Sequence, residues 1–124
     1  MGRVEQAVRA NVAAGTVLHT TARHKPFTVE RYDDDGVVLL LGEGRHPVRV
    51  TWVCLEGVVG FLADQGFIEI GGQHISEGQP GTLDEHMKTC TKTNTARWVA
   101  VLLEAAGVVS LSVVPDRPVQ VALI

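Results

Sequence analysis

Residues 82–124, TLDEHMKTCTKTNTARWVAVLLEAAGVVSLSVVPDRPVQVALI, decide the fold of this chain. Thr82 and Glu85 have the spacing of a capping box, which predicts the start of a helix directly after Thr82. An apolar stripe that begins at Ala96 predicts a second helix, and Gly107 suits the position just after its end. The stretches VVSLSVV and VQVALI alternate at period two around Pro-Asp-Arg-Pro, which predicts a β-hairpin.

The preceding segment extends this pattern. Residues 53–65 have the apolar spacing of a helix, residues 67–70 predict a short strand, and residues 71–81 predict a polar loop. Gly57 and Gly60 each destabilise the helix by about 1 kcal/mol relative to Ala, so we expect a neighbouring helix to approach closely there. The resulting order of helix, strand, helix, helix, strand and strand is typical of a winged helix-turn-helix, a layout that most often meets nucleic acid.

The first 52 residues predict a helix followed by closely spaced strands. The helix covers residues 3–13, where valines recur on one face. Four β segments follow, at residues 16–22, 27–32, 37–41 and 48–52. Short strands joined by tight turns suggest a small, strongly bent barrel. We therefore expect an α+β fold, with the helix and barrel in residues 1–52 and the winged helix in residues 53–124.

Charge and hydropathy limit the classes of partner. No apolar run approaches the roughly 20 residues that cross a bilayer, and charges interrupt the N-terminal segment, which is atypical of a signal peptide. We therefore expect a cytoplasmic, nucleoid-associated protein without a membrane partner. The net charge of −3 argues against tight nucleic-acid binding. However, Lys88, Lys92 and Arg97 form a local basic stripe without acids, so weak, salt-dependent binding to a duplex is expected.

Candidate DNA contacts lie on the second predicted helix and on several turns. Thr93 or Asn94 is equally well explained as a helix N-cap, and exposed basic residues are often solvated without a function. In a recognition helix, however, such residues meet base edges and phosphates. The full set of predicted DNA-binding residues is Arg23, His24, Lys25, Arg45, His46, Arg49, Lys88, Lys92, Thr93, Asn94, Arg97 and Arg117.

Three of the six aromatic residues, Phe27, Tyr32 and Trp52, fall in the predicted barrel. Rings gathered in this way form cages that hold methylated groups by cation–π and apolar contact. We therefore predict a modified-base pocket made by these residues. The alternative is that the rings simply fill a small core.

The stretches GTVLHT, KPFTVERYDDDGVVLLLG and GRHPVRVTW resemble a Tudor-type small barrel, related in shape to SH3 domains. Joined to the helix-turn-helix, they resemble small actinobacterial proteins that bind 5-methylcytosine DNA through a Tudor-like domain. The resemblance covers nearly the whole chain, although it rests on spacing and turns. It implies recognition of double-stranded methylated DNA, with the barrel contacting the modified base.

Signals for catalysis and metal binding are weak. The acidic run Asp33-Asp34-Asp35 lacks the spacing of a calcium loop, and a β-turn explains it. A two-metal nuclease that uses these acids is a remote alternative. Cys54 and Cys90 show no ligand spacing with the histidines, so we expect isolated core thiols and no metal. No phosphate loop or nucleophile elbow is present, and we expect neither a cofactor nor enzymatic activity.

The sequence thus predicts a non-catalytic protein that binds double-stranded DNA and selects 5-methylcytosine. The rival hypothesis is a Tudor and winged-helix interaction module that recognises a protein or a methylated peptide, which the acidic net charge favours. A winged helix also provides a dimer surface, so a homodimer is a further expected arrangement.

Overall fold

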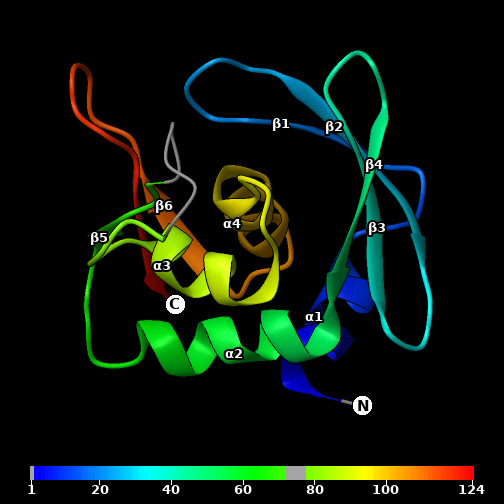
Figure 1. Cartoon of the computed structure of the whole chain (residues 1–124), viewed down its shortest axis with the longest axis horizontal. Coiled ribbons are helices and arrows are strands. Elements are labelled where there is room, and N and C mark those ends of the chain that lie inside the picture. The colour runs from blue at the N-terminus through cyan, green and yellow to red at the C-terminus, as the bar shows by residue number, and fades with distance from the viewer. Residues whose placement is uncertain (1, 72–77) are drawn as a thin grey trace.

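The computed structural model describes residues 2–71 and 78–124 and shows a mixed α+β fold (Figure 1). In chain order, its elements are α1 (Arg3–Asn11), β1 (Val17–His19), β2 (Pro26–Tyr32), β3 (Gly36–Leu41), β4 (His46–Thr51), α2 (Trp52–Leu62), β5 (Ile68–Glu69), α3 (Leu83–Cys90), α4 (Ala96–Ala105), β6 (Val109–Ser112) and β7 (Gln120–Leu123). The predicted helices and strands are thereby confirmed within a few residues. Residues 72–77 of the predicted polar loop lie outside the described residues. None of the helices in the described part of the chain has the length and apolar character of a membrane span.

The first four strands form an antiparallel sheet in the order β1-β2-β3-β4. The pairing of β2 with β3 shifts between Val29 and Arg31, which is the signature of a bulge that bends the sheet. Within the described residues, β1 and β4 lie at opposite edges and do not pair. The sheet is therefore open, and the closed barrel that the sequence predicts is not found.

The last three strands form a second antiparallel sheet, in the order β5-β7-β6. Figure 1 shows α4 at the centre of the molecule between the two sheets, with α2 running below it. A single apolar cluster includes Val8 of α1, Leu39 of β3, Leu55 of α2 and Leu102 of α4. The segments on both sides of residue 52 therefore share one core.

Two local predictions need correction. Thr82 is the N-cap of α3, but its side chain makes no cap hydrogen bond and donates instead to the carbonyl of Gln79. The predicted capping box with Glu85 therefore does not form. The predicted N-caps of α4, Thr93 and Asn94, precede the observed N-cap, Thr95.

The close approach expected at Gly57 and Gly60 is confirmed at Gly57 only, because a Cβ atom at Gly60 would have no neighbour within 4 Å among the described residues. A Cβ atom at Gly57 would lie 2.7 Å from Cε1 of His86, which belongs to α3. The glycine therefore leaves room for an imidazole ring between α2 and α3.

Candidate functional site

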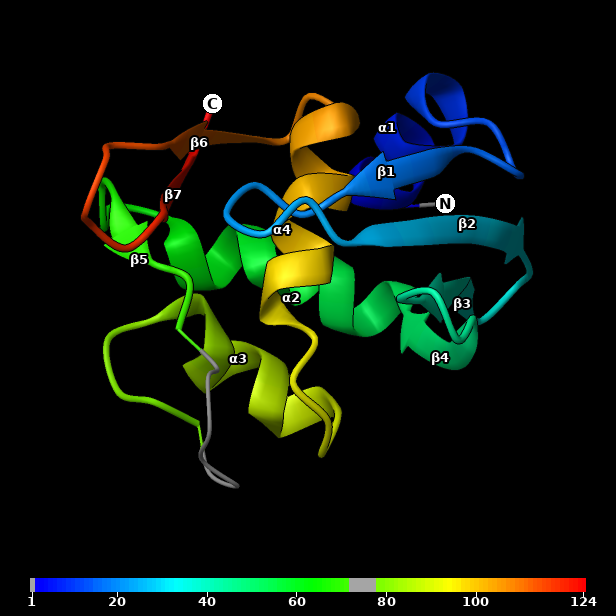
Figure 2. The ribbon, with the colours of Figure 1, turned by 90° about the horizontal axis from the view of Figure 1, so that it is seen from above.

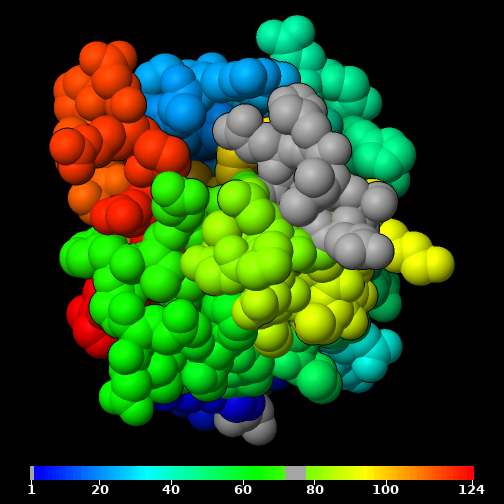
Figure 3. Space-filling view, turned by 60° about the vertical axis from the view of Figure 1, so that its left-hand side comes forward, coloured from blue at the N-terminus to red at the C-terminus, as the bar shows by residue number. Residues whose placement is uncertain are grey.

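A cleft of about 370 Å³ lies where the first sheet, α4 and the second sheet meet. Arg23 of the β1–β2 connection, Arg97 of α4 and Arg117 of the β6–β7 connection all line it. Figure 1 shows the β1–β2 and β6–β7 connections on the same side of the molecule, above α4. Figure 2 looks onto this side, where the β1–β2 connection passes over α4. The space-filling view in Figure 3 places the two connections next to each other.

Hydrogen bonds within the two connections position Arg23 and Arg117. In the β1–β2 connection, the buried hydroxyl of Thr20 accepts from the backbone N–H of Lys25, at 3.0 Å. In the β6–β7 connection, the backbone N–H of Arg117 donates to the carbonyl of Val114, at 3.2 Å. Asp116 at the tip of this turn has a φ of 63°, a left-handed conformation that suits a tight turn. Both arginines are thus presented by ordered turns.

The cleft carries a positive charge, although the whole chain is acidic. Its charged lining residues among those described are three arginines and one carboxylate, Glu69 of β5. Arg97 lies in the first turn of α4, where the unpaired backbone N–H groups of a helix also favour an anion. The cleft is therefore suited to a negatively charged ligand.

Several other predicted DNA-binding residues are exposed but do not line the cleft. Arg45 and His46 lie on the β3–β4 hairpin, which Figure 1 shows on the same side of the molecule. Exposed residues beside the cleft-lining arginines are His24 and Lys25 before β2 and Lys92, Thr93 and Asn94 before α4. These side chains are available to a large ligand that extends past the cleft.

Lys88 is placed differently from the prediction. Its ammonium lies 3.1 Å from Oδ1 and 3.2 Å from Oδ2 of Asp84, whose side chain is fully buried. The Lys88 side chain itself is only 5% exposed. The ammonium therefore serves an internal ion pair, and a phosphate contact would require that pair to break.

Arg49 is also paired. Its partner is the acidic turn Asp33-Asp34-Asp35, for which the sequence left a metal-binding role as a remote alternative. Asp33 accepts from Arg49 at 2.6 Å and from the backbone N–H groups of Asp35 and Gly36. The hydrogen bond from Asp35 is the largest cause that lowers the pKa of Asp33, and Arg49 also lowers it. This run is thus an Asx turn that binds an arginine, and a phosphate contact at Arg49 would require this ion pair to break.

The predicted aromatic pocket does not assemble. Phe27 is 1% exposed and packs edge-on against Trp98, at 5.3 Å between ring centres. Tyr32 lies five residues further along the same strand, about 16 Å away at the usual rise of a strand. Tyr32 instead pairs with Trp52, at 5.9 Å between ring centres. The three rings therefore do not form one cage.

The Tyr32–Trp52 pair is already in contact with a cation. The guanidinium of Arg9 lies 5.5 Å from the centre of the Tyr32 ring and 5.3 Å from that of Trp52. The Arg9 guanidinium and the Trp52 indole both donate to the carbonyl of Asp33, at 3.0 and 2.9 Å. Burial raises the pKa of Tyr32, while Arg9 opposes this rise. This arrangement matches the alternative in which the rings have a structural role.

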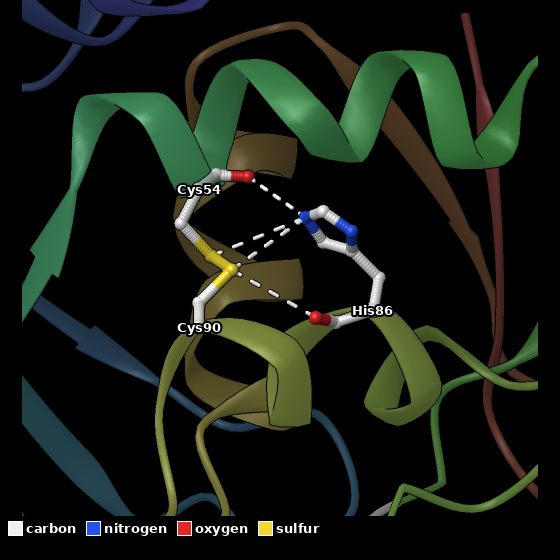
Figure 4. Close-up of side chains that lie close together, drawn as sticks. All are labelled: Cys54, His86 and Cys90. Atoms are coloured by element: carbon white, nitrogen blue, oxygen red, sulfur yellow. Dashed lines mark hydrogen bonds between the residues drawn. A yellow bond between two sulfur atoms is a disulfide. The ribbon is translucent and has the colours of Figure 1, made fainter.

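One cluster was missed by the sequence analysis. Cys54 and Cys90 are not isolated thiols, because their sulfur atoms form a disulfide between α2 and α3, and His86 lies beside it (Figure 4). Each residue offers one ligand atom, and these atoms lie within 4.8 Å of one another. The available signal was the four-residue spacing of His86 and Cys90, which places both side chains on one helix face.

Comparison of this chain with known protein families, curated proteins and solved structures found no match.

Proposed function

We propose that this protein binds double-stranded DNA through the face that carries the arginine-lined cleft. The observation that supports this proposal best is the convergence of Arg23, Arg97 and Arg117 from three separate elements. Guanidinium groups form strong, paired hydrogen bonds with phosphate and with the guanine edge. A duplex is long enough to contact the cleft and the exposed residues of the neighbouring turns together.

A winged helix is the framework that we propose for this interaction. The order α2, β5, α3, α4, β6 and β7 supports it, since α4 then takes the place of the recognition helix and the β6–β7 connection that of the wing. In this arrangement, Asn94 approaches base edges at the start of α4, while Arg97 and Arg117 approach phosphates. The first sheet contributes Arg23 from the other side of the cleft.

Selectivity for 5-methylcytosine is the finer part of the proposal. The aromatic pair of Tyr32 and Trp52 is engaged by Arg9, so we assign base discrimination to the cleft instead. Its volume of about 370 Å³ accommodates an extruded base. Glu69 lines this cleft and is of the residue type that accepts from the exocyclic amine of cytosine. A buried methyl group contributes only about 1 kcal/mol, so we expect a preference of several-fold.

Fluorescence anisotropy with two otherwise identical duplexes, one carrying 5-methylcytosine, tests both parts of the proposal. Phosphate contacts make affinity fall with salt, and three of them predict a loss of about 40-fold between roughly 50 and 200 mM salt. Tighter binding of the methylated duplex at every salt concentration is expected. Equal binding of both duplexes would exclude methyl selectivity and leave DNA binding intact.

The same experiment separates the rival interaction module. A protein or peptide partner is bound with a much weaker salt dependence than a duplex. Absence of measurable duplex binding even at low salt would contradict DNA binding and leave the interaction module as the better hypothesis.

A further inference from the structure

The cluster of Cys54, His86 and Cys90 lies between two helices and joins residues distant in sequence. Cys54 comes from the first turn of α2, while His86 and Cys90 lie four residues apart on α3. Nε2 of His86 lies 4.0 Å from Sγ of Cys54 and 3.9 Å from Sγ of Cys90. Figure 4 shows the imidazole facing both sulfur atoms. Three donor atoms of metal-ligand type therefore converge on one point.

The imidazole of His86 is held in a shaped slot. A Cβ atom at Gly57 would lie 2.7 Å from Cε1 and 3.1 Å from Nε2 of the ring, so this slot depends on glycine. The ring of Phe61 packs against His86, at 5.6 Å between ring centres. The carbonyl of Cys54 lies 2.9 Å from Nε2 and accepts a hydrogen bond from it. These contacts set the direction in which Nε2 points.

The two sulfur atoms and the imidazole nitrogen match the ligands of a borderline-soft metal ion. Two thiolates and one imidazole form the borderline-soft set that Zn²⁺ prefers over Mg²⁺ or Ca²⁺. Zinc–ligand bond lengths of about 2.0–2.3 Å give ligand atoms about 3.6–3.8 Å apart in a tetrahedral site. The two distances from Nε2 exceed this by only a few tenths of an ångström. Cys54 is buried and Cys90 is exposed, so the ion would be reached from the Cys90 side.

We propose that Cys54, His86 and Cys90 bind Zn²⁺ when the cysteines are reduced. A dithiol first transfers two electrons to the disulfide, which gives two cysteine thiols and leaves the dithiol as a cyclic disulfide. Zinc then replaces the protons of both thiols. The proton of Nε2 shifts to Nδ1 through solvent, so the neutral imidazole gives up its hydrogen bond to the Cys54 carbonyl and becomes the third ligand. The two thiol protons pass to solvent or buffer. The fourth position stays open on the exposed side.

The ion and the disulfide are thus two alternative crosslinks of the same helices. Each fixes α2 to α3 at the same place, and the oxidation state of the cysteines decides which of them forms. The oxidised chain does not bind the ion, because both sulfur atoms are committed to each other.

Cobalt provides the spectroscopic test. The whole chain is reduced with a dithiol under anaerobic conditions, freed of metal and dithiol, and titrated with Co²⁺. Saturation at one ion per chain, with thiolate-to-cobalt charge-transfer bands, is expected, and Zn²⁺ should abolish the bands by displacing Co²⁺. The oxidised chain should give no such bands. A reduced chain without a saturable thiolate band, or equal binding by the oxidised chain, overturns the proposal.

Variants assign the ligands. Cys90→Ser changes an exposed residue, and His86→Gln removes the imidazole; each should weaken Co²⁺ binding by about tenfold or more. His19→Gln changes an exposed histidine on β1 and serves as the control that leaves affinity unchanged. Cys54 is buried, so the far-UV circular dichroism of Cys54→Ser is compared with that of wild type to check that the variant folds. If Cys54→Ser unfolds, Cys90→Ser alone tests whether the cysteines bind the ion. Undiminished binding by Cys90→Ser or His86→Gln contradicts the assignment.

Discussion

The guanidinium of Arg9 lies 5.3 Å from the centre of the Trp52 ring and joins α1 to the start of α2. The indole of Trp52 also donates to the carbonyl of Asp33, at 2.9 Å. A cation from the chain itself therefore lies against an aromatic pair that would otherwise suit a methylated ligand. We therefore propose base selectivity for the cleft and not for the aromatic pair.

Replacing Trp52 should therefore affect stability more than selectivity. Trp52 is 6% exposed, and truncation of such a ring to alanine costs about 3–5 kcal/mol. Trp52→Ala should lower the midpoint of urea unfolding sharply. The folded fraction of the variant should keep the wild-type ratio of affinities for methylated and unmethylated duplexes. A stable variant that binds both duplexes equally would contradict this prediction and support the aromatic pocket as the site that recognises the methylated base.

Arg97→Ala and Arg117→Ala should each weaken duplex binding and reduce its salt dependence. Each phosphate contact that is lost lowers the slope of log affinity against log salt by about 1. Anisotropy titrations at several salt concentrations measure both quantities. Arg3→Ala removes an exposed arginine from α1 and is the matched control, because Arg3 is not among the residues that line the cleft. Equal losses in all three variants would show that only net charge matters.

Lys88→Met should destabilise the fold, because it leaves the carboxylate of Asp84 buried without its cation. Oδ1 of Asp84 makes no hydrogen bond among the described residues, so the ion pair is its compensation. The expected loss is about 3–5 kcal/mol in the free energy of unfolding. The double variant Asp84→Asn with Lys88→Met should recover part of it. Lys92→Met, at an exposed position, should change stability by less than about 0.5 kcal/mol.

Glu56→Ala should loosen α1 at its N-terminus. The Glu56 carboxylate accepts from the backbone N–H groups of Val4 and Glu5, at 2.9 and 3.0 Å, and so caps a helix from another element. Loss of such charge-assisted bonds costs about 2 kcal/mol. Hydrogen exchange should show faster exchange of the first amides of α1. Glu43→Ala changes an exposed turn residue and should leave these rates as in wild type.

The lowered pKa of Asp33 should make the free energy of unfolding depend on pH in the acidic range. Its pKa is lowered in the folded chain, first by the hydrogen bond from Asp35. The native state therefore binds the proton less readily than the unfolded chain, so ionised Asp33 stabilises the fold. This stabilisation is present above the unfolded pKa and is lost as pH falls through the folded pKa. Asp33→Asn removes it, so the stability advantage of wild type should shrink below about pH 4. Urea unfolding of wild type and Asp33→Asn across this range measures the effect, and an advantage of wild type that stays constant down to about pH 2 would contradict it.

Local pattern was sufficient to predict the secondary structure. The valines of α1 recur at helical spacing, and the alternating residues of β6 and β7 flank a turn with proline at both ends. The cost of glycine in a helix correctly predicted a close helix neighbour at Gly57, but the same argument failed at Gly60, where none is found among the described residues. Such signals depend on residues within a few positions of one another, which is why they can be seen in the sequence.

The candidate site was predictable only in part. Arg23, Arg97 and Arg117 were recognised as residue types in turns and at a helix start, but nothing in their spacing showed that they line one cleft. Lys88 and Arg49 carry the same charge as the cleft arginines, yet the carboxylates of Asp84 and Asp33 engage them. Partners of a charged side chain are set by packing, which composition does not report.

The sequence by itself determined the helices, the strands and their order, because hydrophobic periodicity and turn residues act locally. Only the tertiary structure decided that the first sheet stays open, since closure depends on whether its edges β1 and β4 meet. It also decided that Arg9 covers Trp52 and that Cys54 meets Cys90 beside His86. These contacts join residues more than thirty positions apart, and the packing of α1, α2 and α3 around one core is what brings them together.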